Sequence, residues 1–186
     1  MAAGKKSVTT RRRLVIDTSI FQAASERPAP DPMGKTCGNL LKEILSICHQ
    51  AVFSLEASDE WKRHRSRFAL RWRTAMTARK KLHFLDESCR NDELRGTLEK
   101  LWGSERDAPD RWEEVEKDLH LVEAALATDT IVLSLERRIR ECLEWACRRR
   151  GARILREIHW IDPVKNPQRL TRLLKGELPR RSRLGS

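Results

Sequence analysis

Short runs of consecutive apolar residues alternate along the chain with longer segments whose apolar residues recur at helical spacing. The apolar runs at 14–16, 51–54 and 131–134 predict β-strands, and residues 152–160 predict a further strand near the end of the chain. Strands that are apolar at every position are typical of a parallel sheet that is covered on both faces. The pattern therefore indicates buried strands.

The segments between these runs predict helices, because their apolar residues lie three or four positions apart. The clearest sets are Leu40, Leu41, Ile44, Leu45 and Cys48; Phe68, Trp72 and Met76, in a helix expected from Trp61 onward; Leu94, Leu98 and Leu101; Val115, Leu119, Val122 and Leu126; and Ile139, Leu143 and Ala146. Strands that alternate with helices favour a parallel, doubly wound sheet. We therefore predict an α/β fold with three layers, α/β/α, around a short parallel sheet.

The length of the chain indicates one domain with basic ends. A chain of 186 residues is long enough for one core and falls within the size of a single domain. Residues 1–12 form a basic arm, and residues 13–162 hold the predicted strands and helices. Pro163 opens a basic tail, residues 163–186, for which we expect partial disorder.

The net charge of +11 is distributed unevenly. Residues 1–13 hold five Lys or Arg and no acid, residues 62–81 hold nine and no acid, and residues 163–186 hold seven against one Glu. A basic periphery around an acidic centre suits a polyanion held at the edges and a cation bound in the middle. Such runs are also found as plain solvated surface, but three separate runs favour a nucleic acid.

The cysteines and the hydropathy indicate a reduced, cytoplasmic protein. The five cysteines include no C-x-x-C pair, so we expect free thiols and no zinc site. No stretch reaches the roughly 18 apolar residues of a membrane span. The N-terminus lacks the apolar region of a signal peptide. We therefore expect a cytoplasmic localisation and no membrane partner.

Four acidic residues lie where parallel strands would end. Asp17 closes the first strand, Glu60 lies six residues beyond the second, and Glu136 lies two residues beyond the third. Asp118 lies in a predicted helix beside the apolar stripe, where an unpaired charge is costly. Ligands of such sheets bind beyond the carboxyl ends of the strands, so we predict that these acids converge there. Like charges that converge are stabilised by a hard divalent cation such as Mg²⁺ or Mn²⁺.

Each acid also has a purely structural alternative. Asp17 is suited to cap the next helix, and Glu136 to be an N-terminal acid of another helix. Glu60 and Asp118 have basic residues close in sequence as ion-pair partners, which are Lys62 and Arg63 for Glu60 and Lys117 and Arg111 for Asp118. Each alternative is at least as good for one acid alone, but one shared site explains all four together.

The motifs around these acids resemble those of PIN-domain ribonucleases, the VapC-like metal-dependent nucleases. Val15-Ile16-Asp17-Thr18-Ser19 is similar to the first motif of the family, and Val52-Phe53-Ser54 through Glu60-Trp61 is similar to the second. Residues 117–129 and 131–136 resemble the third and fourth motifs, with Asp118 and Glu136 as their acids. The resemblance covers about residues 13–162, within which 62–117 would be an enlarged helical insert.

One position departs from the family pattern. The family usually has Asp where this chain has Glu136, so a carboxylate is kept but lies one methylene farther from the backbone. Asp129 has the residue type that the family uses in place of Glu136. It precedes the strand at 131–134, however, and should lie at the opposite edge of the sheet. This departure predicts a shifted metal or a weaker activity.

The resemblance implies a divalent-metal-dependent endoribonuclease. Asp17 would be the principal ligand of Mg²⁺ or Mn²⁺, Asp118 and Glu136 would complete the shell, and Glu60 would orient the attacking water. The partners it implies are RNA, an antitoxin protein if the chain is the toxin of a toxin–antitoxin pair, and a second copy of the chain. Two alternatives stay open: a non-catalytic RNA- or protein-binding module on the same fold with a weakened acidic site, and a nuclease that acts on DNA.

Arginines of the basic run at 62–81 are the predicted contacts to RNA phosphates, namely Arg63, Arg65, Arg67, Arg71 and Arg73. Phe68 and Trp72 in the same segment are suited to stack on bases. An aromatic pair at helical spacing is more often part of the core, which we favour. Ser19 and Ser134 are candidates to hold the acids or the scissile phosphate, and turn or cap roles are the alternative.

Overall fold

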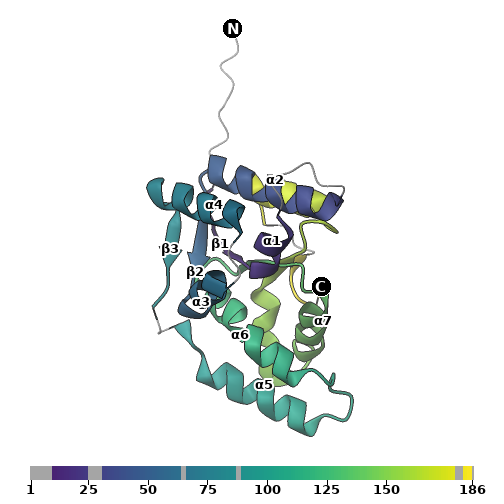
Figure 1. The fold of residues 1–186 in the computed structure, drawn as a ribbon. Helices are drawn as coiled ribbons and strands as arrows, with labels where there is room; N and C mark the ends of the chain where they lie inside the picture. The colour runs from purple at the N-terminus through teal and green to yellow at the C-terminus, as the bar shows by residue number, and fades with distance from the viewer. Residues whose placement is uncertain (1–9, 25–30, 64–65, 87–88, 179–181, 186) are drawn as a thin grey trace.

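A five-stranded parallel sheet lies at the centre of the computed structural model, with helices on both faces (Figure 1). The structure describes residues 10–24, 31–63, 66–86, 89–178 and 182–185. The strands are β1 (Arg13–Ile16), β2 (Gln50–Phe53), β3 (Leu82–Phe84), β4 (Ile131–Leu133) and β5 (His159–Ile161). The helices are α1 (Thr18–Ala23), α2 (Pro32–Ser46), α3 (Leu55–Arg63), α4 (Arg67–Ala78), α5 (Asp92–Ser104), α6 (Trp112–Leu126), α7 (Arg137–Ala146), the 3₁₀ helix η2 (Arg150–Glu157) and α8 (Pro167–Leu174). The predicted three-layer α/β/α class is confirmed.

The strand order β3-β2-β1-β4-β5 places a reversal of topology beside β1. The chain runs outward from β1 to β3 and then crosses to the other side of β1 to add β4 and β5. Open α/β sheets bind ligands at this kind of switch point, beyond the carboxyl ends of the strands. Ile16 of β1 pairs with Leu133 of β4, and the N–H of Asp17 donates to the Leu133 carbonyl at 3.0 Å. The residues that follow these two strands, Asp17 and Ser134, are therefore brought together at the switch point.

Successive residues of β1 face opposite sides of the sheet, as the period of a strand requires. Leu14 and Ile16 belong to the apolar cluster covered by α1, α2, α4 and α8. Val15 belongs to the second cluster, covered by α5, α6 and α7. Since both faces are covered, the three buried positions of β1 after Arg13 are all apolar, which is the pattern that predicted the strand.

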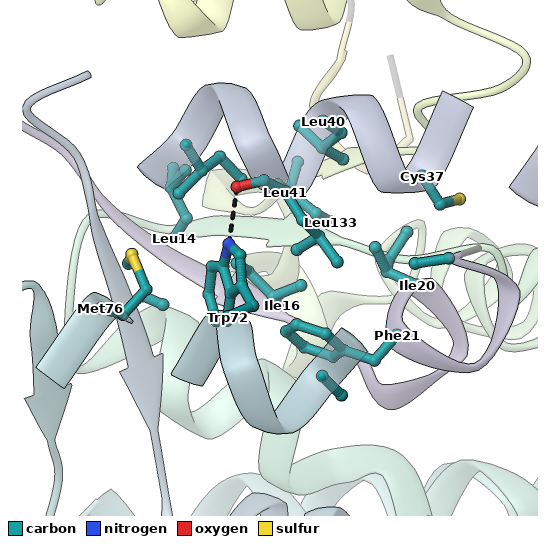
Figure 2. Packing of buried hydrophobic residues seen from close by; sticks show 14 of the residues in the cluster. Leu14, Ile16, Ile20, Phe21, Cys37, Leu40, Leu41, Trp72, Met76 and Leu133 are labelled. Carbon is teal, nitrogen blue, oxygen red and sulfur yellow. Dashed lines mark hydrogen bonds between the residues drawn. The ribbon is translucent and has the colours of Figure 1, made fainter. Parts of the chain in front are cut away.

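Trp72 fixes the packing of α4 on α2 (Figure 2). Its ring is buried among Leu14, Phe21 and Met76, and its indole N–H donates to the Leu41 carbonyl at 2.6 Å. A buried Trp needs such a partner for its polar atom. Phe68 is buried in the same cluster, so the preferred reading of this aromatic pair as core is confirmed.

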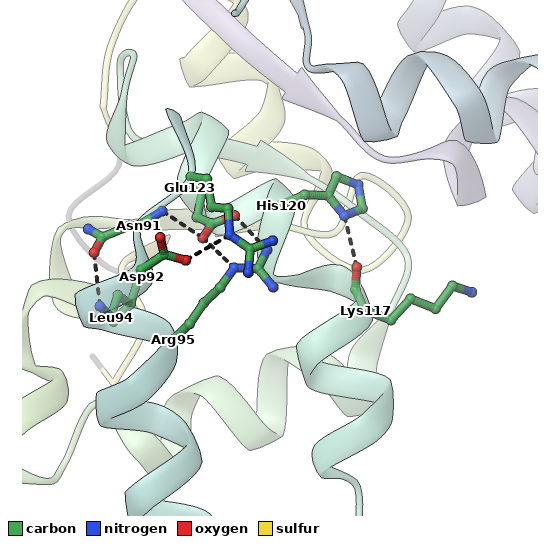
Figure 3. A network of polar contacts seen from close by, with 8 residues as sticks. Asn91, Asp92, Leu94, Arg95, Lys117, His120 and Glu123 are labelled. Carbon is green, nitrogen blue, oxygen red and sulfur yellow. Dashed lines mark hydrogen bonds and ion pairs between the residues drawn. The ribbon is translucent and has the colours of Figure 1, made fainter. Parts of the chain in front are cut away.

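A buried ion pair joins α5 to α6 on the other side of the sheet (Figure 3). Glu123 is only 2% exposed and accepts from Nε and Nη2 of Arg95, each at 2.7 Å. The N–H of Asn91 donates to the same carboxylate at 2.9 Å. In the same view, Nδ1 of His120 lies 2.9 Å from the Lys117 carbonyl, to which it donates. The polar groups at the start of α5 thus fix its position on α6.

The structure differs from the prediction at three segment boundaries. The edge strand β3 lies inside residues 62–117, which were expected to be helical. Among the described strands it pairs only with β2. Its residues are half-buried or exposed, so the strand has no apolar run that would have predicted it. The helix after β2 begins at Leu55, not Trp61, and Ser66 caps the next helix by accepting from the Ala69 N–H at 3.0 Å. Residues 150–157 form η2, and only His159–Ile161 join the sheet.

The described residues of the C-terminal tail, 163–178 and 182–185, are folded against the core, whereas partial disorder was expected for the tail. In α8, Leu170, Leu173 and Leu174 lie at i, i+3 and i+4 and enter the cluster beneath α2. Beyond α8, the N–H of Leu184 donates to the Ile158 carbonyl at 2.9 Å, and Ser182 Oγ lies 2.7 Å from Nδ1 of His159. Both Ser182 and Leu184 are buried. This segment therefore contributes to the fold in addition to carrying charge.

The buried pair generates a stability prediction. Arg95→Leu leaves the Glu123 carboxylate buried without its partner, which should reduce the free energy of unfolding by about 3–5 kcal/mol. Arg90→Leu is the matched control, because Arg90 and Asp92 pair at 2.7 Å but are 58% and 81% exposed. Exposed pairs contribute only about 0–1 kcal/mol. Urea unfolding of both variants gives the comparison, and equal losses would contradict a special role for the buried pair.

Candidate active site

A pocket of about 290 Å³ opens at the switch point and brings the four predicted acids together. They come from four separate segments: the end of β1, α3, α6 and the start of α7. The described residues that line the pocket are Asp17, Thr18, Ser19, Gln22, Glu60, Glu114, Lys117, Asp118, Glu136 and Ile139. The predicted convergence of the acids at this edge is therefore present in the structure.

Asp17 is the most firmly held of the four. It is 5% exposed, and its Oδ2 accepts from the hydroxyls of Ser19 and Ser134, both at 2.6 Å. Its Oδ1 accepts from the Ser19 N–H at 3.2 Å, so Asp17 also caps α1. Short bonds from hydroxyls to a carboxylate are of the strong, charge-assisted type. The cap role and the site role predicted for Asp17 are both compatible with this geometry.

The two serines connect the ends of β1 and β4. While donating to Asp17, Ser19 Oγ accepts from the Leu135 N–H at 3.2 Å, and Ser134 Oγ accepts from the Glu136 N–H at 2.9 Å. Each hydroxyl thus uses both its donor and an acceptor lone pair. The expectation that these serines hold an acid is confirmed for Asp17.

Thr18 links Glu60 to the buried carboxylate. Its hydroxyl oxygen lies 3.2 Å from Glu60 Oε2 and 3.3 Å from Asp17 Oδ1, so the two carboxylates share one donor. Glu60 reaches this position from α3, which starts two residues after β2. The alternative partners Lys62 and Arg63 have side chains outside the described part of the structure.

The electrostatics of Asp118 reflect the crowding of like charges. Burial, and after it the neighbouring carboxylate of Asp17, raises the pKa of Asp118 to about 6, and Glu60 contributes in the same direction. The alternative ion pair with Arg111 is absent from the described contacts, because Arg111 binds Glu114 at 2.7 Å. Asp118 is therefore a half-buried acid that faces other acids.

Glu136 experiences the same effect. Burial first, and then Asp17 and Glu114, raise the pKa of Glu136 above its ordinary value. Glu136 occupies the N-cap position of α7 but makes no side-chain cap bond. Glu136 is therefore an N-terminal acid of α7, as the structural alternative states, and its carboxylate also lines the pocket.

Two further residues of the pocket wall were not predicted as part of the site. Glu114 is a fifth carboxylate, one helical turn before Asp118 on the same face of α6, a spacing that would have revealed it. Lys117 is the only cation among the described lining residues, and it lowers the pKa values of both Asp118 and Glu136. The wall is thus strongly acidic with one compensating charge.

Within the described ranges, no three His, Cys, Asp or Glu side chains are grouped closely enough to hold a metal ion as they stand. The fit to a cation therefore rests on donor chemistry. Five carboxylates share one pocket, and hard oxygen donors are the ligands that Mg²⁺ and Mn²⁺ prefer. Glu60 and Glu136 have long side chains whose rotamers can change, so the donor set suits such an ion.

Other predicted residues lie away from this pocket. Asp129 accepts from the Arg13 N–H at 2.8 Å, at the amino edge of the sheet, and so does not replace Glu136. Arg67 and Arg71 are exposed on α4, while the Arg73 guanidinium lies over the Phe53 ring, 5.6 Å from its centroid. The predicted contact Arg65 and the side chain of Arg63 lie outside the described residues. None of the three described arginines lines the acidic pocket.

No protein-family model, no curated protein and no solved structure matches this chain. The similarity to PIN-domain nucleases therefore rests on the motif residues alone. In the described part of the chain, every helix is too short or too polar to cross a membrane.

The raised pKa of Asp118 predicts that removing its charge stabilises the fold. Because the pKa is higher in the folded state, the cost of ionising this group is absent at about pH 3, builds between about pH 4 and pH 6, and is nearly complete above pH 6. We expect Asp118→Asn to melt at a higher temperature than the unsubstituted protein at about pH 8, and at nearly the same temperature at about pH 3. Glu113→Gln, an exposed acid of the same helix, is the control and should show no such gain. A lower melting temperature for Asp118→Asn at about pH 8 would refute this interpretation.

Proposed function

We propose that this protein is a divalent-metal-dependent endoribonuclease. The observation that supports the proposal is the convergence of Asp17, Glu60, Asp118 and Glu136 on one pocket at the switch point of a parallel sheet. Burial, and after it the neighbouring acids, raise the pKa values of Asp118 and Glu136, and this arrangement destabilises the fold unless it binds a cation. Perturbed acids that face a pocket are typical of functional sites. RNA as the substrate is supported by the motif resemblance.

Asp17, Asp118 and Glu136 are the residues that would hold Mg²⁺ or Mn²⁺. The ion would supply a nucleophile at neutral pH and offset the charge that builds on the phosphate. Asp17 is oriented in advance by Ser19 and Ser134, so little rearrangement is needed at this position. Glu60, held beside Asp17 through Thr18, would orient the attacking water and accept its proton.

The basic surfaces would hold the RNA, and the acidic pocket would cut it. Arg67 and Arg71 on α4 are exposed and positioned for phosphate contacts that do not depend on sequence. Binding through such contacts weakens steeply as salt rises. A role as the toxin of a toxin–antitoxin pair, with an antitoxin and a second copy of the chain as partners, belongs to this proposal through the motif resemblance only.

A second candidate function is a non-catalytic RNA- or protein-binding module. It is favoured by Glu in place of the family's Asp at position 136, and by the absence of a ready three-ligand group among the described residues. Such a module would bind RNA equally well with metal or with a chelator.

Cleavage of labelled RNA and single-stranded DNA pools tests the proposal. We expect cutting of RNA with Mn²⁺ or Mg²⁺, none with a chelator, and loss of cutting in Asp17→Asn. Asp110→Asn, an exposed acid outside the pocket, is the matched control and should retain activity. Metal-independent binding without cleavage would favour the binding module. Cutting confined to DNA would mean that the substrate is DNA and not RNA.

A further inference from the structure

A second cavity, of about 370 Å³, adjoins the acidic pocket across Glu136. Trp160 of β5 and Asp162, which follows that strand, form one side, and α7 forms another with Arg140 and Glu144. In register, Ile161 of β5 lies beside Leu133 of β4. Asp162 is therefore the counterpart of Ser134 one strand farther along the sheet, and parallel strands lie about 4.8 Å apart. The two cavities are consecutive positions along one edge.

The wall of this cavity carries charges of both signs in nearly equal number. Three cations, Arg137, Arg140 and Lys165, face four carboxylates, two of which are Glu144 and Asp162. A phosphate would meet no net positive charge here. A neutral planar group with donors and acceptors on its edge would find a partner for each, and the cavity is within the range of small-ligand sites.

Two of the polar groups are well fixed. Arg140 Nε donates to Glu144 Oε1 at 2.8 Å, and the two side chains are 21% and 25% exposed. Asp162 is 8% exposed, and its Oδ1 accepts from the N–H groups of Val164 and Lys165 at 2.8 and 3.0 Å. Among the hydrogen bonds of the described residues, none engages the second oxygen of either carboxylate, and both residues line the cavity.

We infer that this cavity binds the base of the nucleotide beside the cleaved phosphate and selects guanine. The inference rests on the proposed nuclease for the position of the phosphate. Guanine offers adjacent N–H donors at N1 and N2 that a carboxylate accepts, and acceptors at O6 and N7 that Arg or Lys satisfies. Glu144 would take the donor edge, and Arg140 or Lys165 the acceptors. The acidic pocket then places the phosphate, and the second cavity sets the sequence that is cut.

Sequencing the cut ends of a randomised RNA tests the inference. We expect guanine to be enriched at one position beside the cut, and its preference over the other bases to fall roughly tenfold in Glu144→Gln and in Lys165→Ala. Glu157→Gln, an exposed acid of η2 outside both cavities, should keep the full preference. Cleavage without a base preference, or a preference unchanged in both variants, would overturn the inference.

A binding measurement separates this inference from the nuclease proposal. Guanosine 5′-monophosphate, titrated in a chelator, should shift the indole N–H signal of Trp160 in the NMR spectrum, and uridine 5′-monophosphate should not. Loss of this shift in Lys165→Ala, whose exposed side chain is not needed for folding, supports the site. Selective binding of the guanine nucleotide with no RNA cleavage would support the guanine site and contradict the nuclease proposal. If the Trp160 signal shifts equally with both nucleotides, or with neither, the cavity does not select guanine and the inference is wrong.

Discussion

The hydrogen bonds to the carboxylate of Asp17 are the interaction on which the site depends. This group lies buried at the switch point, where Ser19 of α1 and Ser134, which follows β4, hold it through their hydroxyls. Through the same hydroxyls, the backbone of Leu135 and Glu136 is fixed to the end of β1. One carboxylate therefore caps α1, joins β1 to β4 and faces the pocket.

The other acids of the pocket lie close to Asp17, and this crowding lowers the stability of the fold. Asp118 and Glu136 have raised pKa values because they are partly buried and close to Asp17. A sequence selected only for stability would not gather five carboxylates on one wall. A bound cation turns this repulsion into binding energy, so the destabilising arrangement is better explained by function than by the fold. Lys117 offsets part of the charge.

The sheet and most of the site could be predicted because both depend on local patterns. Asp17 directly follows an apolar run, and strand ends define the functional edge, so its position needed no tertiary information. Glu114 lies one helical turn before Asp118, so its place in the pocket followed from the prediction for Asp118. Asp162 could not be predicted as readily, since its relation to the pockets depends on which strand neighbours β4. The edge strand β3 and helix α8 were missed for a similar reason. Their pattern is weak or short, and packing against β2 and the core stabilises them.

The most direct test of the central claim is a crystal structure of the protein grown with Mn²⁺, with anomalous scattering used to locate the ion. We expect an anomalous peak in the acidic pocket, from an ion bound by oxygens of Asp17 and Asp118, and no such peak in crystals of Asp17→Asn. The metal site would be contradicted if crystals of the unsubstituted protein show well-ordered pocket residues but no peak, at Mn²⁺ concentrations that saturate known metal-dependent nucleases. In that case the acids would need another explanation.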